Sequence, residues 1–308
     1  MVSYIVRRLF YAMVIITCAT VVAFTLIRII PGNPARIISP NASQEQIDQL
    51  TKKLGYDQPI PVQFVSFVKD AAQGDFGRSL FLKQDVATVI ATSLPYTLVL
   101  ASTALAIALV IGIGLGTLAA FQRDRIVDRV VLGIAVLGQS MPGFWVGLVL
   151  ILVVSVKLGW FPAFGYEGPS SLVLPALALA LSLLATLIRT SRLVMLDVLS
   201  QDYIRAAYSR GLKRGTIVIR YALRNIWVPI LTVVGVQIGF VLGNAVVIEY
   251  IFNFPGLGHT ILNAVLRRDY PVVQAVTILM AVGFVVINTI IDLSYGFLDP
   301  RIRKELSK

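Results

Sequence analysis

The chain has 308 residues, of which 57% are hydrophobic and 14% charged, and its mean hydropathy is +0.82. Soluble domains contain roughly 45–50% apolar residues, so this composition excludes a water-soluble globular protein and predicts an all-α polytopic membrane protein. The net charge of +11 does not indicate nucleic-acid binding, because the positive residues follow the loops between apolar segments instead of forming a basic face on a soluble domain.

Six apolar segments are long enough to cross a bilayer, since roughly 20 helical residues span a hydrocarbon core about 30 Å thick. The formal charges within them, Arg28 and Asp292, lie near segment ends and are predicted to reach the headgroups. The six segments lie near residues 9–30, 97–120, 130–156, 172–188, 227–248 and 272–293.

The distribution of Lys and Arg predicts that both termini are cytoplasmic. With this orientation, 17 of the 27 Lys and Arg residues fall in cytoplasmic segments. Most of the external Lys and Arg residues lie in one long loop, and long loops count little in the positive-inside rule. The first apolar segment is expected to be a retained span, because it lacks a small-residue cleavage site before Pro31.

The long external loop, residues 31–96, is predicted to fold into a small cap. Ser43 and Gln46 fit a capping box, and Gly55 is placed to end the helix that they begin. The expected inward face of this helix consists of Ile47, Leu50 and Leu54.

The rest of the loop is predicted to hold a second helix and a turn. The second helix begins near Pro61, and residues 74–77 form the turn. Asp85 is expected to cap an amphipathic stretch that runs to Pro95. The apolar side chains of the second helix are Phe64, Val65, Phe67 and Val68.

Two shorter external loops, residues 158–162 and 250–258, are rich in aromatic residues. Aromatic rings with a polar edge are typical of the membrane interface, which favours a simple anchoring belt. A gate or re-entrant element is the alternative.

The largest cytoplasmic segment, residues 189–226, is basic and helical in pattern. Asp202 is predicted to cap a short helix that carries Ala206 and Ala207, and Gly211 suits its left-handed C-terminal position. The predicted organisation is therefore residues 1–30 as the first span, 31–96 as the cap, 97–293 as the transmembrane core and 294–308 as a cytoplasmic tail.

The residues needed for catalysis or metal binding are scarce. His259 is the sole histidine and Cys18 the sole cysteine, so a zinc site is not expected. Residues 138–142 resemble the start of a Gly-x-Ser-x-Gly motif, but proline stands where the second glycine is needed, so Ser140 is not expected to be a nucleophile. There is no phosphate-binding Gly-x4-Gly-Lys-Ser/Thr motif. No catalytic, metal or cofactor site is predicted.

Glycines at four-residue intervals predict close helix packing in the fifth span. Plain packing within the chain explains them, and a packing seam at a subunit interface beside a moving pathway is the alternative. Gly112 and Gly116 form a similar pair in the second span. The candidate pathway or interface residues are Gln139, Ser140, Gly235, Gln237, Gly239, Gly243 and Asn244.

Several blocks, taken together, resemble the ABC importer permeases of the dipeptide, oligopeptide and nickel class. Residues 202–229 resemble the EAA loop of these permeases, although Arg205 stands where glutamate is usual. The other matching blocks are residues 7–9, 31–34, 54–59, 74–79, 249–258, 268–271 and 299–301.

The resemblance implies the type I permease fold, in a prokaryotic inner membrane, and a set of partners. Two permeases, usually different, would form the pathway, two cytoplasmic ATPases would bind ATP and Mg, and an external binding protein would deliver solute. The EAA loop would form a coupling helix that docks on one ATPase. The implied coupling residues are Asp202, Arg205, Ala206, Ala207, Gly211 and Leu212.

Two rival classes are a secondary transporter and an intramembrane enzyme. A secondary transporter needs ionisable groups or broken helices deep in the membrane, and the six spans carry charge only near their ends. The enzyme needs the catalytic groups rejected above. Peptides are the leading solutes, and nickel chelates, glutathione and other peptide-like solutes are compatible.

Overall fold

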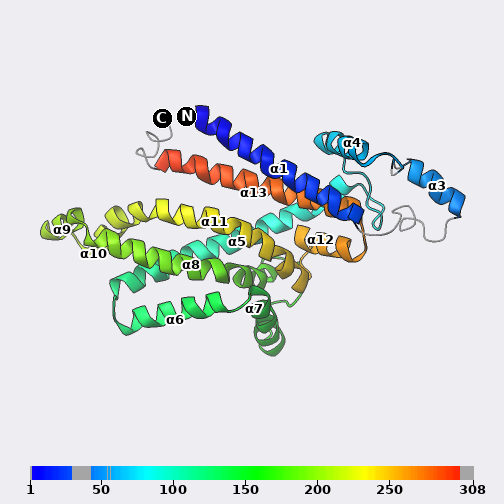
Figure 1. The fold of residues 1–308 in the computed structure, drawn as a ribbon. Helices are drawn as coiled ribbons and strands as arrows, with labels where there is room; N and C mark the ends of the chain where they lie inside the picture. The colour runs from blue at the N-terminus through cyan, green and yellow to red at the C-terminus, as the bar shows by residue number, and fades with distance from the viewer. Residues whose placement is uncertain (1, 30–42, 54, 56, 299–308) are drawn as a thin grey trace. The chain divides into compact units, whose positions relative to one another are not determined.

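The computed structural model describes residues 2–29, 43–53, 55 and 57–298 (Figure 1). These residues are mostly helical, and strand pairing among them is limited to an isolated bridge between Arg78 and Asp85. The elements in chain order are α1 (Val2–Ile29), α3 (Gln44–Lys53), α4 (Ile60–Ala72), α5 (Val86–Phe121), α6 (Ile126–Ser140), α7 (Gly143–Leu150), the π-helical η1 (Ile151–Lys157), the 3-10 helix η2 (Pro169–Leu172), α8 (Val173–Ser200), α9 (Asp202–Ser209), α10 (Arg214–Thr216), the π-helical η3 (Ile217–Ala222), α11 (Leu223–Ile251), α12 (Leu257–Leu266) and α13 (Tyr270–Leu298).

Five of the described helices are long and apolar enough to cross a membrane, and they correspond to five of the six predicted spans. The side chains of Arg28 and Asp292 lie outside the part of the chain whose side chains the structure describes. The five segments are Val6–Thr25, Val86–Phe121, Pro169–Ser200, Asn225–Ile251 and Tyr270–Ile291.

The remaining predicted span, residues 130–156, is not one straight helix. Residues Ile126–Ser140 and Gly143–Lys157 meet at a bend of 103°. Pro142 lacks a backbone N–H and restricts the residue before it, and Met141 accordingly takes an extended conformation with φ −92° and ψ 129°. The predicted segment is therefore a bent pair of helices and not one continuous helix, because Pro142 ends the first helix within a stretch that has no charged residue.

The first cap helix agrees with its sequence signals. The Ser43 N–H donates to Oε1 of Gln46 at 3.0 Å, and the Gln46 N–H donates to Oγ of Ser43 at 3.4 Å, which is the predicted capping box. Gly55 has a φ of +68°, as expected for a helix-ending glycine. Ile47 is buried, whereas Leu54 and the side chain of Leu50 lie outside the described residues.

The second cap helix, α4, has Pro61 in its first turn, as predicted. The rings of Phe64 and Phe67 lie 5.1 and 5.8 Å from the ring of Phe24 in α1, measured between centroids. Val65 and Val68 are exposed, so only part of the predicted apolar face is packed within the chain.

The amphipathic stretch that was predicted to end at Pro95 is instead the first part of α5, which continues to Phe121 over 36 residues. The predicted separation from the second span is therefore wrong. Pro95 removes one N–H from the helical ladder. Burial of Val89 and Leu100 on either side stabilises the helix through that gap.

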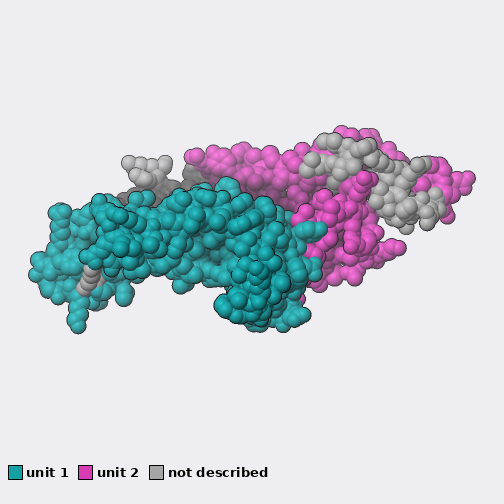
Figure 2. All heavy atoms as spheres, turned by 90° about the horizontal axis from the view of Figure 1, so that it is seen from below, with its two compact units in different colours: residues 1–4, 97–254, 286–308 teal, residues 5–96, 255–285 magenta. Residues whose placement is uncertain are grey.

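Contacts divide the chain into two units, which Figure 2 distinguishes by colour. Unit 1 consists of Met1–Tyr4, Thr97–Phe254 and Val286–Lys308, and its most buried span is α8, which contacts α6, α7, α9 and α11. Unit 2 consists of Ile5–Tyr96 and Pro255–Val285. Its core is built from Val86, Leu257, Ala264, Val272, Ala275 and Val276.

Candidate functional site

The short helix in the predicted coupling segment forms as α9, and its C-terminal end has the predicted chemistry. Gly211 has a φ of +74°, and its N–H donates to the carbonyl of Tyr208 at 2.9 Å. The Leu212 N–H donates to the carbonyl of Ala207 at 3.3 Å, which completes a Schellman motif. Gly211 therefore fixes where the helix stops and where the chain turns.

The N-terminal end of α9 differs from the prediction. Gln201, with φ −71° and ψ 147°, precedes the helix, and no side chain caps it. Asp202 is the first helical residue, so its predicted capping role is wrong, although its negative charge still suits the N-terminal turn. Nη1 of Arg205 lies 3.5 Å from Oδ1 of Asp202, and both side chains are exposed.

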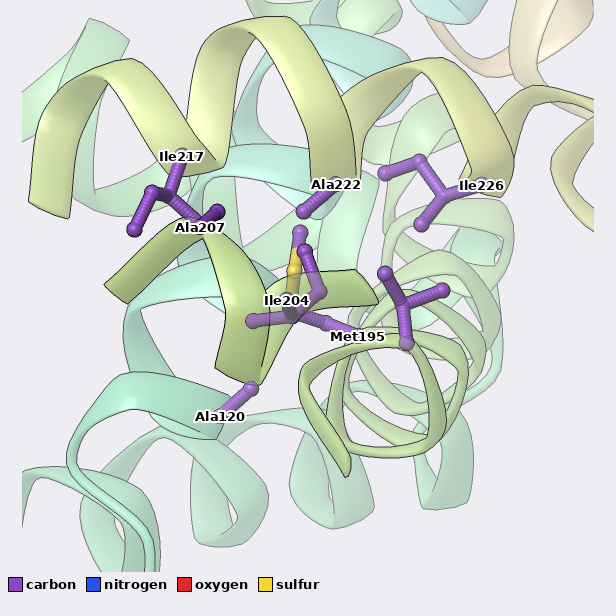
Figure 3. Close-up of a cluster of buried hydrophobic side chains, with 8 residues drawn as sticks. Ala120, Met195, Ile204, Ala207, Ile217, Ala222 and Ile226 are labelled. Atoms are coloured by element: carbon purple, nitrogen blue, oxygen red, sulfur yellow. The ribbon is translucent and has the colours of Figure 1, made fainter. Parts of the chain in front are cut away.

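The inner face of α9 belongs to the core of unit 1. Ile204 and Ala207 are 0% and 4% exposed and belong to a buried apolar cluster (Figure 3). Leu212 packs against the same cluster. Ala207 and Leu212 therefore face their own chain, and the surface that a partner could contact is narrower than predicted. The other buried members of the cluster are Ala120 of α5, Met195 and Val198 of α8, and Ile217, Ala222 and Ile226 of the returning segment.

The outer face of α9 combines aromatic, small and basic side chains. Tyr203, Ala206 and Arg210 follow an i, i+3, i+7 spacing and are all exposed. The hydroxyl of Tyr203 accepts a hydrogen bond of 2.9 Å from Nδ2 of Asn225, so the ring is held at the surface. The glycine at the end of the helix, Gly211, is also exposed, with no atom within 4 Å of the position of an added Cβ.

Close helix packing that requires glycine occurs on α5, at the pair Gly112 and Gly116. A Cβ at Gly112 would lie 2.7 Å from Cβ of Leu187, and a Cβ at Gly116 would lie 2.5 Å from the carbonyl oxygen of Ile188. Real Cβ atoms do not approach so closely, so both positions require glycine for α5 to reach α8.

The glycines of α11 are placed differently. Gly235 is buried and Gly239 half-buried, while Gly243 and Asn244 are exposed, and an added Cβ at Gly243 would meet no atom within 4 Å. Gln237 donates from Nε2 to Oγ1 of Thr186 on α8 at 3.3 Å. The chain itself therefore leaves space beside Gly243 on this face of α11.

Gln139 and Ser140, the candidates in the third span, lie at the end of α6 beside the 103° bend, and both are exposed. The hydroxyl of Ser140 donates to the carbonyl of Val136 at 2.9 Å. A hydroxyl bonded back to its own helix is not activated as a nucleophile.

A buried ion pair joins α6 to α8, and sequence reasoning did not find it. The guanidinium of Arg192 donates from Nε and Nη2 to the two carboxylate oxygens of Asp128, each at 2.6 Å. The side chain of Asp128 is 3% exposed and that of Arg192 16%. The two residues are 64 positions apart in the sequence.

The aromatic loop at the end of α11 folds into unit 1 instead of forming a simple belt. Phe252 and Phe254 are 2% and 0% exposed, and the N–H of Gly165 donates to the carbonyl of Phe252 at 2.8 Å. The ring of Tyr166 lies edge-on to Phe254, with centroids 5.5 Å apart. The anchoring-belt interpretation is therefore wrong for these two phenylalanines.

Two sequence blocks that carried the family resemblance meet in unit 2. Ser79 and Asp269 are hydrogen-bonded through their side chains, and Asp269 also accepts the backbone N–H of Leu80 at 3.0 Å. The guanidinium carbon of Arg267 lies 3.7 Å from the ring centroid of Phe81. No group of three or more His, Cys, Asp or Glu side chains that could share a metal ion occurs among the described residues.

Comparison with known proteins agrees with this architecture. Residues 112–304 match the family described as "Binding-protein-dependent transport system inner membrane component", and residues 1–101 match "Binding-prot-dependent transport system membrane comp, N-term". The glutathione transport system permease proteins GsiC of Escherichia coli (strain K12) and Shigella dysenteriae serotype 1 (strain Sd197) are each 38% identical to this chain over 304 residues, which cover 98% of this chain and 99% of theirs.

A solved structure is similar in fold. It is a chain from "Inward facing conformations of the MetNI methionine ABC transporter", with a TM-score of 0.54 at 18% sequence identity. The match covers 71% of this chain and 97% of that chain. The all-helical architecture predicted from the sequence is thus confirmed as that of an ABC importer permease.

Proposed function

Because the chain belongs to the binding-protein-dependent transport system inner membrane components, the permease subunits of ABC importers, we propose that it imports a peptide-like solute and receives the driving motion at α9. As a member of this family it is a multi-pass inner-membrane subunit without catalytic activity of its own. The proposal concerns its solute, its partners and the residues that couple it to them.

The observation that carries the coupling proposal is the two-sided character of α9. Its inner face, through Ile204 and Ala207, is packed on the ends of α5 and α8 and on the segment leading into α11. Its outer face presents Tyr203, Ala206 and Arg210, which are all exposed. A force applied to the outer face would be passed to three helices at once.

The proposed partners are a sister permease, two ATPases that bind ATP and Mg, and a solute-binding protein on the opposite side of the membrane. A groove on one ATPase would receive the outer face of α9, where Ala206 and Gly211 allow close approach and Arg205 and Arg210 can meet acidic groups. Gly243, exposed on α11, is a candidate contact with the sister permease.

The proposed solute is a small peptide or a peptide-like molecule. The support is the name of the relatives, glutathione transport system permease, and the full-length match to them. Uptake into proteoliposomes that contain the complete complex, with its binding protein and ATP, tests this directly. Solute exchange by this chain without nucleotide would instead indicate a secondary transporter.

A matched pair of glycine substitutions tests the coupling role. In Gly211→Val the β-branched side chain must adopt a positive φ, so we expect normal membrane insertion but loss of most solute-stimulated ATP hydrolysis and uptake. The control is Gly215→Val, since Gly215 has no positive φ and no atom within 4 Å of an added Cβ. Full stimulation and transport by Gly211→Val would refute the assignment of α9.

A further inference from the structure

The ion pair formed by Asp128 and Arg192 is largely buried, because the two side chains are 3% and 16% exposed. Both carboxylate oxygens are engaged by the guanidinium at 2.6 Å, and Oδ2 also accepts the backbone N–H of Asp124 at 3.0 Å. A two-point contact fixes the orientation of one helix on the other, which a single-point contact cannot do. The first turn of α6 is therefore held to α8 in one register.

Arg192 lies at a junction on α8. On one side, the backbone N of Arg192 would be 3.1 Å from a Cβ at Gly116, so α5 and α8 nearly touch at this level. One and two turns further along α8, Met195 and Val198 pack against the inner face of α9. The end of α8 thus contacts α5, α6 and α9 within about three turns.

The contact between α6 and α8 does not need charge for stability alone. Apolar side chains also join these helices, in a cluster that includes Val131 and Ala135 of α6 with Ala185 and Ile188 of α8. Replacing a buried ion pair by apolar groups is often neutral or stabilising, and its best-attested advantage is the specification of one arrangement. The bidentate pair fixes the relative position of α6 and α8, which apolar contacts alone would allow to slide along each other.

We propose that Asp128 and Arg192 are positioning residues for transport, which make α6 follow α8 when α9 is displaced. The far end of α6 carries Gln139 and Ser140 and stops at the bend before Pro142. The pair would therefore relay motion from α9 through the end of α8 to the broken third span. This inference rests on the proposed coupling role of α9.

The experiment compares Asp128→Asn, Asp128→Glu and the control Asp124→Asn in the full complex. Asp128→Asn removes the charge, whereas Asp128→Glu keeps it. The Asp124 side chain is 80% exposed, and asparagine tolerates its φ of +63°. We expect solute transported per ATP hydrolysed to fall at least fivefold in Asp128→Asn, to fall less than twofold in Asp128→Glu, and to remain unchanged in the control.

A second measurement separates positioning from simple stability. In a Cys18→Ala background, the rate at which a maleimide labels Ser140→Cys should change on addition of ATP and vanadate. That nucleotide-dependent change should disappear with Asp128→Asn, while the amount of assembled complex stays the same. Full coupling in Asp128→Asn would overturn the inference, and so would failure of this variant to assemble, which would make the pair a folding element.

The outcome for Gly211→Val distinguishes the two proposals. If Gly211→Val uncouples the complex but Asp128→Asn does not, α9 retains its role and only the relay through α6 is refuted. If Gly211→Val remains fully coupled, the role of α9 is itself refuted.

Discussion

The hydroxyl of Ser79 donates a hydrogen bond to Oδ2 of Asp269, across 190 residues of sequence. The same carboxylate accepts the backbone N–H groups of Leu80 and Phe81, at 3.0 and 3.3 Å. The Asp269 side chain thereby fastens the segment after the Gly74–Gly77 turn to the start of α13, within unit 2. Two short motifs that looked independent in the sequence are halves of one contact.

Replacing Asp269 by Asn should loosen this segment. The residue is 3% exposed, and hydrogen bonds to a charged group contribute about 1.5–3 kcal/mol each. We expect a stability loss of about 2 kcal/mol in the purified protein, with faster proteolysis between residues 74 and 85. The control, Asp85→Asn, removes an exposed carboxylate 3.5 Å from Arg78 and should change little. Equal proteolysis of the two variants would contradict this prediction.

A methyl group at Gly116 should push α5 away from α8. The added Cβ would lie 2.5 Å from the carbonyl oxygen of Ile188, so Gly116→Ala is expected to lower stability by about 1–3 kcal/mol. Gly114→Ala is the matched control on the same helix, because a Cβ at Gly114 meets no atom within 4 Å. Thermal unfolding of both variants in detergent checks the difference, and a Gly116→Ala protein as stable as its control would show that the helices separate freely.

The substitution Gly243→Leu tests whether α11 contacts the sister permease. Its own chain leaves the position open, so Gly243→Leu should fold normally yet reduce co-purification of the sister subunit several-fold. Gly133→Leu makes the same substitution at an exposed, open position of α6 and should assemble normally. If Gly243→Leu assembles as well as Gly133→Leu, this face of α11 meets lipid.

The orientation inferred from the Lys and Arg distribution is tested by cysteine labelling in the Cys18→Ala background. A cysteine at Glu45, in α3, should react in intact cells with a reagent that does not cross membranes. A cysteine at Asp202, in α9, should react only after permeabilisation. Labelling of Asp202→Cys in intact cells would reverse the proposed topology.

Local signals in the sequence were sufficient to predict where several helices begin or end. The capping box at Ser43, the first turn of α4 around Pro61 and the left-handed glycine at Gly211 each depend on residues within one or two turns. The apolar lengths likewise indicated where the spans lie, because the hydrocarbon core imposes the same length on each.

The features that sequence reasoning missed depend on contacts between distant segments. Ala207 looked like an exposed small residue, but α8 and the segment before α11 bury it. The partnership between Asp128 and Arg192 depends on how α6 lies on α8, which no local pattern encodes. Pro142 was visible in the sequence, yet the absence of charged residues on both sides of it outweighed that signal.

The bend between α6 and α7 also leaves backbone carbonyl groups at the end of α6 that need hydrogen-bond donors inside the membrane. The 15 residues of α6 reach about 22 Å at 1.5 Å per residue, which is less than the hydrocarbon thickness of about 30 Å. The last turn of α6 therefore ends within the membrane, where acyl chains offer no donors to its free carbonyl groups. Water or neighbouring protein must supply those donors, so the third span requires a polar environment inside the membrane.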